Sequence, residues 1–185
     1  MRWCASFFRV TAFLTISEGV NWFGMVYRGM NTVRVLPKIL CVCSGNTDRS
    51  PMLKAILQLE LARAGDYNIA VHSAGTSLSS CARHPASFHV QKLFPGMLHS
   101  HTSKWIGELS LNQYGVILCM TNAQRKNVFA LQPDLETTVL SFPGDLPDPK
   151  GLDERVYKVE KALLLQWGQS VLFAFKDSLH SCVRK

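Results

Sequence analysis

The sequence predicts a single three-layer α/β domain, in which helices cover both faces of a four-stranded parallel sheet. Three observations lead to this fold class. Short, apolar, β-branched runs alternate along the chain with longer segments of helical periodicity. Turn-forming residues separate most of these segments, and no internal repeat or low-complexity stretch interrupts the alternation. Strands that alternate with helices favour a parallel sheet buried on both faces.

The first half of the predicted domain is a strand, a helix and a second strand. Residues 33–42 form an apolar run rich in valine, as expected of a buried strand. A Ser-Pro pair opens a helix over 52–64, and Gly65 ends it. Residues 68–73 then predict a short second strand.

The second half continues the alternation. It predicts a helix over 85–94, a strand over 115–120, a helix over 122–131 and a strand over 137–142. A long amphipathic helix over 153–179 closes the domain. We expect its buried stripe to contain Val156, Val159, Leu163, Trp167, Val171 and Phe175.

We expect the compact domain to cover residues 30–185 and to follow an N-terminal extension, residues 1–29. The extension is apolar and aromatic, but its apolar centre at 10–16 is too short to span a bilayer. An unstructured segment or an over-long start is the first interpretation. A membrane anchor or targeting segment is the second, so the only membrane contact we consider is through residues 1–29.

Composition describes a globular protein with a basic surface. Apolar residues make up 47% of the chain and charged residues 18%, and the net charge is +7. The chain has no zinc-ligand spacing and no block of lysine and arginine, so we expect no nucleic-acid partner, no metal and no cofactor. A chain of 185 residues needs no disulfides to build a core, and the six cysteines therefore favour a reducing, cytoplasmic location.

The stretch CSGNTDRSP, residues 43–51, carries the chemistry. It follows a predicted strand and precedes a predicted helix, with Cys43 at one end and Arg49 near the other. Gly45 and Asn46 tolerate a left-handed backbone, which turns successive N–H groups inward. The helix N-terminus adds positive charge, which favours a bound dianion and a thiolate. The alternative is an ordinary turn with a core cysteine.

This stretch resembles the phosphate-binding loop of the low-molecular-weight protein tyrosine phosphatases. Three further segments are similar to that family: SAGT at 73–76, VILCMT at 116–121 and LPDP at 146–149. The resemblance covers roughly residues 36–175 and implies a flavodoxin-like topology. In such sheets ligands bind at the carboxyl ends of the strands, where the first strand and the loop after the last would meet.

The resemblance implies a role for each residue. Cys43 would be the nucleophile that forms a cysteinyl-phosphate, Arg49 would clamp the phosphoryl group, and Asp148 would act as general acid and then as base. Asn46 would hold the loop geometry, and the Ser50 hydroxyl would hydrogen-bond the thiolate. The phosphate-binding residues implied are Ser44, Gly45, Asn46, Thr47, Asp48 and Ser50.

Two loop positions depart from the family pattern. Asp48 stands where many members have a second cysteine, so the disulfide that protects the nucleophile is lost. We expect its carboxylate to point outward, since an inward charge would be unpaired beside an anion. Thr47 stands where tyrosine-directed members usually have isoleucine, and it is similar to the arginine-phosphatase branch. It is otherwise an ordinary β-branched loop residue.

The expected rim of the site lacks aromatic side chains. Tyrosine-directed members often carry them after the Asp-Pro pair and after the second strand, where this chain has Lys150-Gly151 and residues 77–84. Arg83, His84 and Lys150 would instead make the rim basic, unless they are merely solvated. Such a rim suits acidic phosphopeptides.

We therefore expect a protein phosphatase that hydrolyses phosphotyrosine, with a phosphorylated protein or peptide as its partner. A protein arginine phosphatase of the same fold is the first alternative, and a non-catalytic phosphoresidue-binding module is the second. Arsenate reductase chemistry is disfavoured because no second cysteine follows Cys119 in the next helix. Thioredoxin-like chemistry is disfavoured because Cys41 and Cys43 are not a CxxC pair.

Overall fold

The computed structural model describes the backbone of residues 38–183 and the side chains of residues 38–175. Its centre is a four-stranded sheet in the order β2-β1-β3-β4, and all neighbouring strands are parallel. This confirms the predicted α/β class and is the order of a flavodoxin-like sheet. The strands are β1 (Lys38–Cys43), β2 (Ala70–Gly75), β3 (Val116–Cys119) and β4 (Thr138–Ser141).

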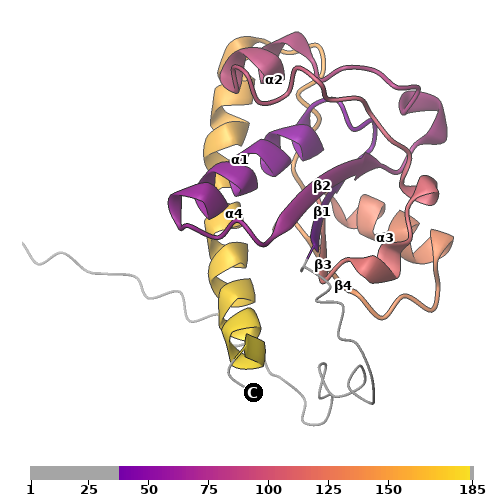
Figure 1. Ribbon diagram of the computed structural model, residues 1–185. Coiled ribbons are helices and arrows are strands. Elements are labelled where there is room, and N and C mark those ends of the chain that lie inside the picture. Colours follow the sequence, from indigo (N-terminus) through magenta and orange to yellow (C-terminus); the bar gives the residue numbers. More distant parts are fainter. Residues whose placement is uncertain (1–37, 184–185) are drawn as a thin grey trace, which may run out of the picture. The chain divides into compact units, whose positions relative to one another are not determined.

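Helices cover both faces of the sheet (Figure 1). α1 (Arg49–Arg63), α2 (Phe88–Leu93) and α4 (Glu154–Val183) contribute to the core on one face, and α3 (Asn122–Leu131) packs on the other. Three short 3-10 helices lie between β2 and β3 in the described residues: η1 (Leu78–Ser80), η2 (Ile106–Glu108) and η3 (Leu111–Gln113).

The predicted elements are all present, with shifted boundaries. The helix predicted over 122–131 has those bounds. The first helix starts three residues earlier than predicted, at Arg49, and the Met52 amide donates to the Asp48 carbonyl. The helix predicted over 85–94 is shorter, because the backbone at Ser87 is still extended. The predicted division after residue 29 lies outside the described residues.

Strand β1 divides the core into two clusters. Ile39, Cys41 and Cys43 face the α1 and α4 side, whereas Leu40 and Val42 face the α3 side. Because β1 extends through Cys43, strand alternation puts Cys41 and Cys43 on the same face. Cys43 is therefore anchored at the end of a fully buried strand.

The buried face of α4 differs from the predicted stripe. Val159 is 60% exposed and Leu163 is 41% exposed. Apolar residues occur on both sides of this helix, so the periodicity alone placed the face about one residue too early. The Gly168 Cα lies close to α1, since a Cβ there would be 3.1 Å from a Leu57 methyl. The residues that are buried are Tyr157, Glu160, Leu164, Gly168, Val171 and Leu172.

Within the described residues, no helix is both long enough and apolar enough to cross a lipid bilayer.

Two neighbouring leucines on α4 test which face of this helix is buried. Leu164→Ala should reduce the free energy of unfolding by about 2–5 kcal/mol, because Leu164 is fully buried in the core. Leu163→Ala removes the same atoms from a partly exposed position and should cost less than about 1 kcal/mol. Urea unfolding of both variants measures the difference. Equal costs would contradict the phase described here.

Candidate active site

The loop after β1 wraps its backbone around the Cys43 sulfur. We call residues 43–49 the Cys43 loop. Cys43 is 2% exposed, its Sγ lies 3.0 Å from the Ser50 hydroxyl, and the Asn46 N–H donates to it at 3.2 Å. Asn46 adopts φ of 55°, a left-handed backbone that asparagine tolerates better than most residues. The Ser50 hydroxyl and the Asn46 N–H are thus placed to donate hydrogen bonds to a thiolate at this position.

The Asn46 amide joins this loop to two other segments. Its side-chain N–H donates to Ser50 Oγ at 2.9 Å, and its side-chain oxygen accepts from the Lys104 N–H at 3.0 Å. Its carbonyl lies 2.8 Å from His101 Nε2, and since a carbonyl can only accept, Nε2 carries the proton. Asn46 is fully buried, so each of these bonds offsets a desolvation cost.

His101 and Lys104 are supporting residues that the sequence did not reveal. His101 is 8% exposed, and its burial lowers the pKa of its imidazole, as do the nearby Lys54 and Lys104. A neutral ring can still donate from Nε2. The sequence carries no local signal for these contacts, because His101 and Lys104 lie 55 and 58 positions from Asn46.

Strand β2 closes the loop from one side. The Thr76 N–H donates to the Cys43 carbonyl at 2.9 Å, and the Ser77 N–H donates to the Ser44 carbonyl at 3.1 Å. No side chain fits at Gly75, where a Cβ would lie 2.5 Å from the Ser44 carbonyl oxygen. The glycine in the SAGT segment is thus a close approach of two backbones.

The rim has apolar side chains that were not expected. The Ser87 N–H donates to the Thr47 carbonyl at 2.9 Å, so the start of α2 borders the loop. The next residue, Phe88, is 75% exposed, and Leu78, which follows Ser77, is 64% exposed. Phe88 belongs to α2 and lies beyond residues 77–84, the segment after the second strand in which rim aromatics were expected.

Arg49 connects the loop to the segment after β4. Its guanidinium donates to the Leu146 carbonyl at 2.9 Å and to an Asp148 carboxylate oxygen at 2.8 Å. Arg49 and Asp148 are 99 positions apart in the chain, and the structure brings their side chains into contact. Arg49 is 4% exposed, and its Nε is buried without a partner among the described residues. One strong donor therefore remains uncommitted.

Asp48 corrects one expectation. We expected an outward, solvated carboxylate, but Asp48 is 5% exposed. One of its oxygens accepts from the Thr47 hydroxyl at 2.7 Å and the other from the Tyr157 hydroxyl at 2.9 Å. The premise that a buried charge would be unpaired was wrong, because Tyr157 of α4 supplies a donor that no local pattern could show. Burial, and secondarily this bond to Asp48, raises the pKa of Tyr157 to about 12.

A second buried carboxyl, Glu160, lies one turn further along α4. It is 3% exposed, and its Oε2 has no partner in the described part of the chain. Burial raises its pKa to about 7, opposed by Arg49 and reinforced by Asp148 and Asp48. Glu160 therefore changes its charge near neutral pH beside the Arg49 guanidinium. The sequence missed it because the helix phase was misjudged.

The other described cysteines are poorly suited to nucleophilic chemistry. Burial raises the pKa of Cys41 and raises that of Cys119 to about 12. Burial also raises the pKa of Cys81 to about 11, although its thiol contacts the Ser44 carbonyl at 3.6 Å. Cys43 is the cysteine at which donors converge.

No group of three or more His, Cys, Asp or Glu residues within residues 38–175 is placed to hold a metal ion.

Comparison with known proteins agrees with this geometry. Residues 38–165 match the model of the family described as low molecular weight phosphotyrosine protein phosphatase. The chain belongs to this family.

Individual relatives carry two different names. A protein-arginine-phosphatase from Bacillus subtilis is 33% identical over 130 residues, which are 65% of this chain and 84% of that protein. The low molecular weight protein-tyrosine-phosphatase Wzb from Salmonella typhi is 28% identical over 144 residues, covering 72% and 93% of the two chains. A solved low molecular weight protein tyrosine phosphatase from T. tengcongensis has the same fold, with a TM-score of 0.68, 24% identity and coverage of 75% and 99%.

Glu160 makes stability depend on pH in a defined direction. Folding raises the pKa of Glu160 from 4.5 to about 7. The contribution of its protonated form to the free energy of unfolding is therefore complete below pH 4.5 and is lost as pH rises through 7. Glu160→Gln should remove this loss and stabilise the protein at pH 8 by roughly 1–3 kcal/mol, with little effect near pH 4.5. Chemical denaturation at both pH values measures it.

Glu154→Gln on the same helix is the matched control. Hydrogen bonds from Lys158 and Lys92 lower the pKa of Glu154 to about 2, so its stabilising contribution is present above 4.5 and is lost as pH falls towards 2. Its substitution should therefore lower stability at pH 8. A Glu160→Gln protein that is also less stable at pH 8 would contradict the assignment of a buried carboxyl with a raised pKa.

Proposed function

We propose that this protein hydrolyses phosphotyrosine in proteins or peptides through a cysteinyl-phosphate intermediate. The observation that carries the proposal is the convergence of three groups from two distant parts of the chain. Cys43 is held by donors at the end of β1, and Arg49, at the start of α1, is joined at 2.8 Å to Asp148 after β4. This is the arrangement that phosphoryl transfer through a thiolate requires.

In the first step the Cys43 thiolate attacks phosphorus and the bond to the tyrosyl oxygen breaks. Arg49 and the N–H groups of the Cys43 loop stabilise the charge on the equatorial oxygens. The buried Nε of Arg49, unpartnered among the described residues, supplies a donor for this purpose. Protonated Asp148 gives its proton to the leaving oxygen, which departs as neutral tyrosine.

In the second step water attacks the phosphorus of the intermediate and the sulfur–phosphorus bond breaks. Asp148, now a carboxylate, accepts the proton of that water. Inorganic phosphate is released, and the thiolate forms again against the Ser50 hydroxyl and the Asn46 N–H. The Asp148 side chain is 51% exposed, which allows it to exchange protons with solvent between the steps.

The contact between Arg49 and Asp148 has a consequence for substrate binding. A phosphoryl group competes with the Asp148 carboxylate for the same guanidinium. Binding of phosphate to Arg49 would thus release Asp148 toward the leaving group.

Two features of the rim support an aromatic leaving group. The exposed Phe88 and Leu78 offer apolar surface beside the loop, on which a phenyl ring can pack. These observations favour phosphotyrosine.

A protein arginine phosphatase is the second candidate. It is supported by Thr47 itself and by the Bacillus subtilis relative of that name. The guanidinium part of phosphoarginine carries a positive charge beside its phosphoryl group, and the carboxylates near Arg49 would then contribute to its recognition. A non-catalytic phosphoresidue-binding module finds less support, since Cys43, Arg49 and Asp148 are all present.

We infer a cytoplasmic location, because the four described cysteines at 41, 43, 81 and 119 are free thiols. The proposed chemistry uses no metal and no cofactor, since each step employs only side chains and water. A membrane contact through residues 1–29 would be additional to this activity, and those residues lie outside the described ones.

Substitution of the two reacting groups tests the mechanism. Cys43→Ser should abolish phosphate release from a phosphotyrosine peptide, and Asp148→Ala should lower kcat by about 10²–10⁴-fold. The loss in Asp148→Ala should be smaller with p-nitrophenyl phosphate, whose leaving group needs less protonation. Asp134→Ala removes an exposed carboxylate elsewhere and should leave kcat unchanged. Phosphate release that survives in Cys43→Ser would exclude the covalent mechanism.

The role of Thr47 is tested by substrate choice. The wild type should hydrolyse phosphotyrosine with a higher kcat/KM than phosphoarginine, and Thr47→Ile should widen the ratio by roughly 10-fold. Thr47→Val keeps the shape and removes only the hydroxyl. A wild type that prefers phosphoarginine would replace the first assignment by the second while leaving the cysteinyl-phosphate mechanism intact.

A further inference from the structure

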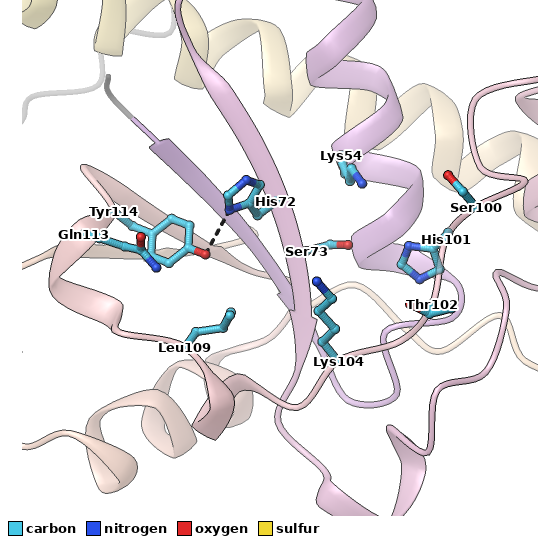
Figure 2. A pocket seen from close by; sticks show the side chains of 10 residues that line it. All are labelled: Lys54, His72, Ser73, Ser100, His101, Thr102, Lys104, Leu109, Gln113 and Tyr114. Atoms are coloured by element: carbon cyan, nitrogen blue, oxygen red, sulfur yellow. Dashed lines mark hydrogen bonds between the residues drawn. The ribbon is translucent and has the colours of Figure 1, made fainter. Parts of the chain in front are cut away.

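A cavity at the outer edge of the sheet gathers positive charge away from the reacting thiol. We call it the β2-edge cavity. It has a volume of about 280 Å³ and lies where α1, β2 and the segment 100–104 meet (Figure 2). The lining residues are Lys54, His72, Ser73, Ser100, His101, Thr102, Lys104, Leu109, Gln113 and Tyr114. None of them is acidic.

The two lysines come from different elements and approach the same part of β2. Figure 2 shows the side chains of Lys54, from α1, and Lys104, from the 100–104 segment, extending toward Ser73. Neither forms an ion pair with a described residue. Burial lowers the pKa of Lys54, and Lys104 lowers it further. Lysine placed this way is costly unless an anion offsets the charge.

The positive charge of the same lysines also acts on His72. Burial lowers the pKa of His72, and Lys38, Lys54 and Lys104 lower it further. Lys38, on β1, donates to the neutral Gln113 side chain, so its charge is not neutralised there. His72 itself lies 3.0 Å from the Tyr114 hydroxyl. Within residues 38–175, the charged groups that shift the pKa of His72 are therefore all positive.

The polar groups of the cavity match the chemistry of phosphate. We propose that the β2-edge cavity is a second oxyanion site, which binds inorganic phosphate or the phosphate group of a monoester. Two ammonium groups supply charge, and hydroxyls of Ser73, Ser100 and Thr102 supply donors on other sides. A tetrahedral anion with three or four terminal oxygens uses donors from several directions, whereas a carboxylate presents only two oxygens.

The site goes beyond the proposed catalytic function but touches the same scaffold. Two of its lining residues hold Asn46: His101 donates to the Asn46 carbonyl, and the Lys104 backbone N–H donates to its side-chain oxygen. An anion held between Lys54 and Lys104 fixes the 100–104 segment and hence the Cys43 loop. Occupancy of the cavity and affinity at the loop are thus thermodynamically linked.

Titration with inorganic phosphate, followed by NMR of the His72 ring, tests the site. His72 lies in the cavity and outside the Cys43 loop, so it reports on the cavity in a protein whose loop cannot bind phosphate. The Arg49→Ala protein removes the clamp of the Cys43 loop, and His72 should still shift saturably, with a dissociation constant on the order of 1 mM or tighter. If that variant does not fold, the wild type is titrated instead, and the lysine variants described next decide which site causes the shift. Bound phosphate should also raise the pKa of His72.

Matched lysine variants decide whether the cavity is responsible. Lys54→Met and Lys104→Met keep a side chain of similar length without its charge. Each should raise the dissociation constant for phosphate at least about tenfold, which is about 1.4 kcal/mol. Lys126→Met removes an exposed lysine of α3, on the other face of the sheet, and should change nothing.

Other ligands separate the sources of the anion. AMP should bind through its phosphate in the Arg49→Ala protein, and adenosine should not bind. Acetate at equal concentration should give no saturable shift. The proposal is overturned if the phosphate shift does not saturate, if it survives both lysine substitutions, or if acetate or adenosine reproduces it. Because no turnover is measured, these results stand whether or not Cys43→Ser retains activity.

Discussion

The geometry of the site depends on one buried amide. Asn46 holds the left-handed turn of the Cys43 loop and connects it to α1 through Ser50 and to the 100–104 segment through Lys104 and His101. A glycine could adopt the same backbone but would leave the Ser50 hydroxyl and the Lys104 N–H without this partner. Cys43, the loop around it and the β2-edge cavity thus share a single support. Their positions cannot be varied independently.

The second constraint is electrostatic. Three carboxyls lie near the Arg49 guanidinium: Asp148 in direct contact, and Asp48 and Glu160 in the layer between the loop and α4. Asp48 is satisfied by two hydroxyls, whereas Glu160 is buried with a free oxygen among the described groups and titrates near neutrality. The negative charge around Arg49 therefore decreases as pH falls, even without a bound substrate. This layer exists because α4 presents two polar residues, Tyr157 and Glu160, on its buried face.

Much of this structure could be predicted from the sequence. Alternating strand and helix patterns were sufficient for the sheet, and the CSGNTDRSP stretch, with LPDP later, located the loop and its acidic partner. What failed depended on contacts between distant residues. Asp48 was expected to point outward. The hydroxyl that stabilises its buried carboxylate comes from Tyr157, 109 positions away, and no local pattern shows that contact. The phase of α4 could not be determined because both of its sides are apolar. His101 and Phe88 matter through where the fold puts them, and no local pattern marks either.

The contact between Arg49 and Asp148 also bears on how the protein becomes active during its synthesis. The two residues belong to the first and last β–α connections of the described domain and are separated by 99 positions. Contacts of such separation form late, since they require closure of a long loop. A nascent chain that has folded only its first β–α unit contains Cys43 and Arg49, but neither Asp148 nor the 100–104 segment that holds Asn46. The complete site would therefore form only after the segment that follows β4 has left the ribosome.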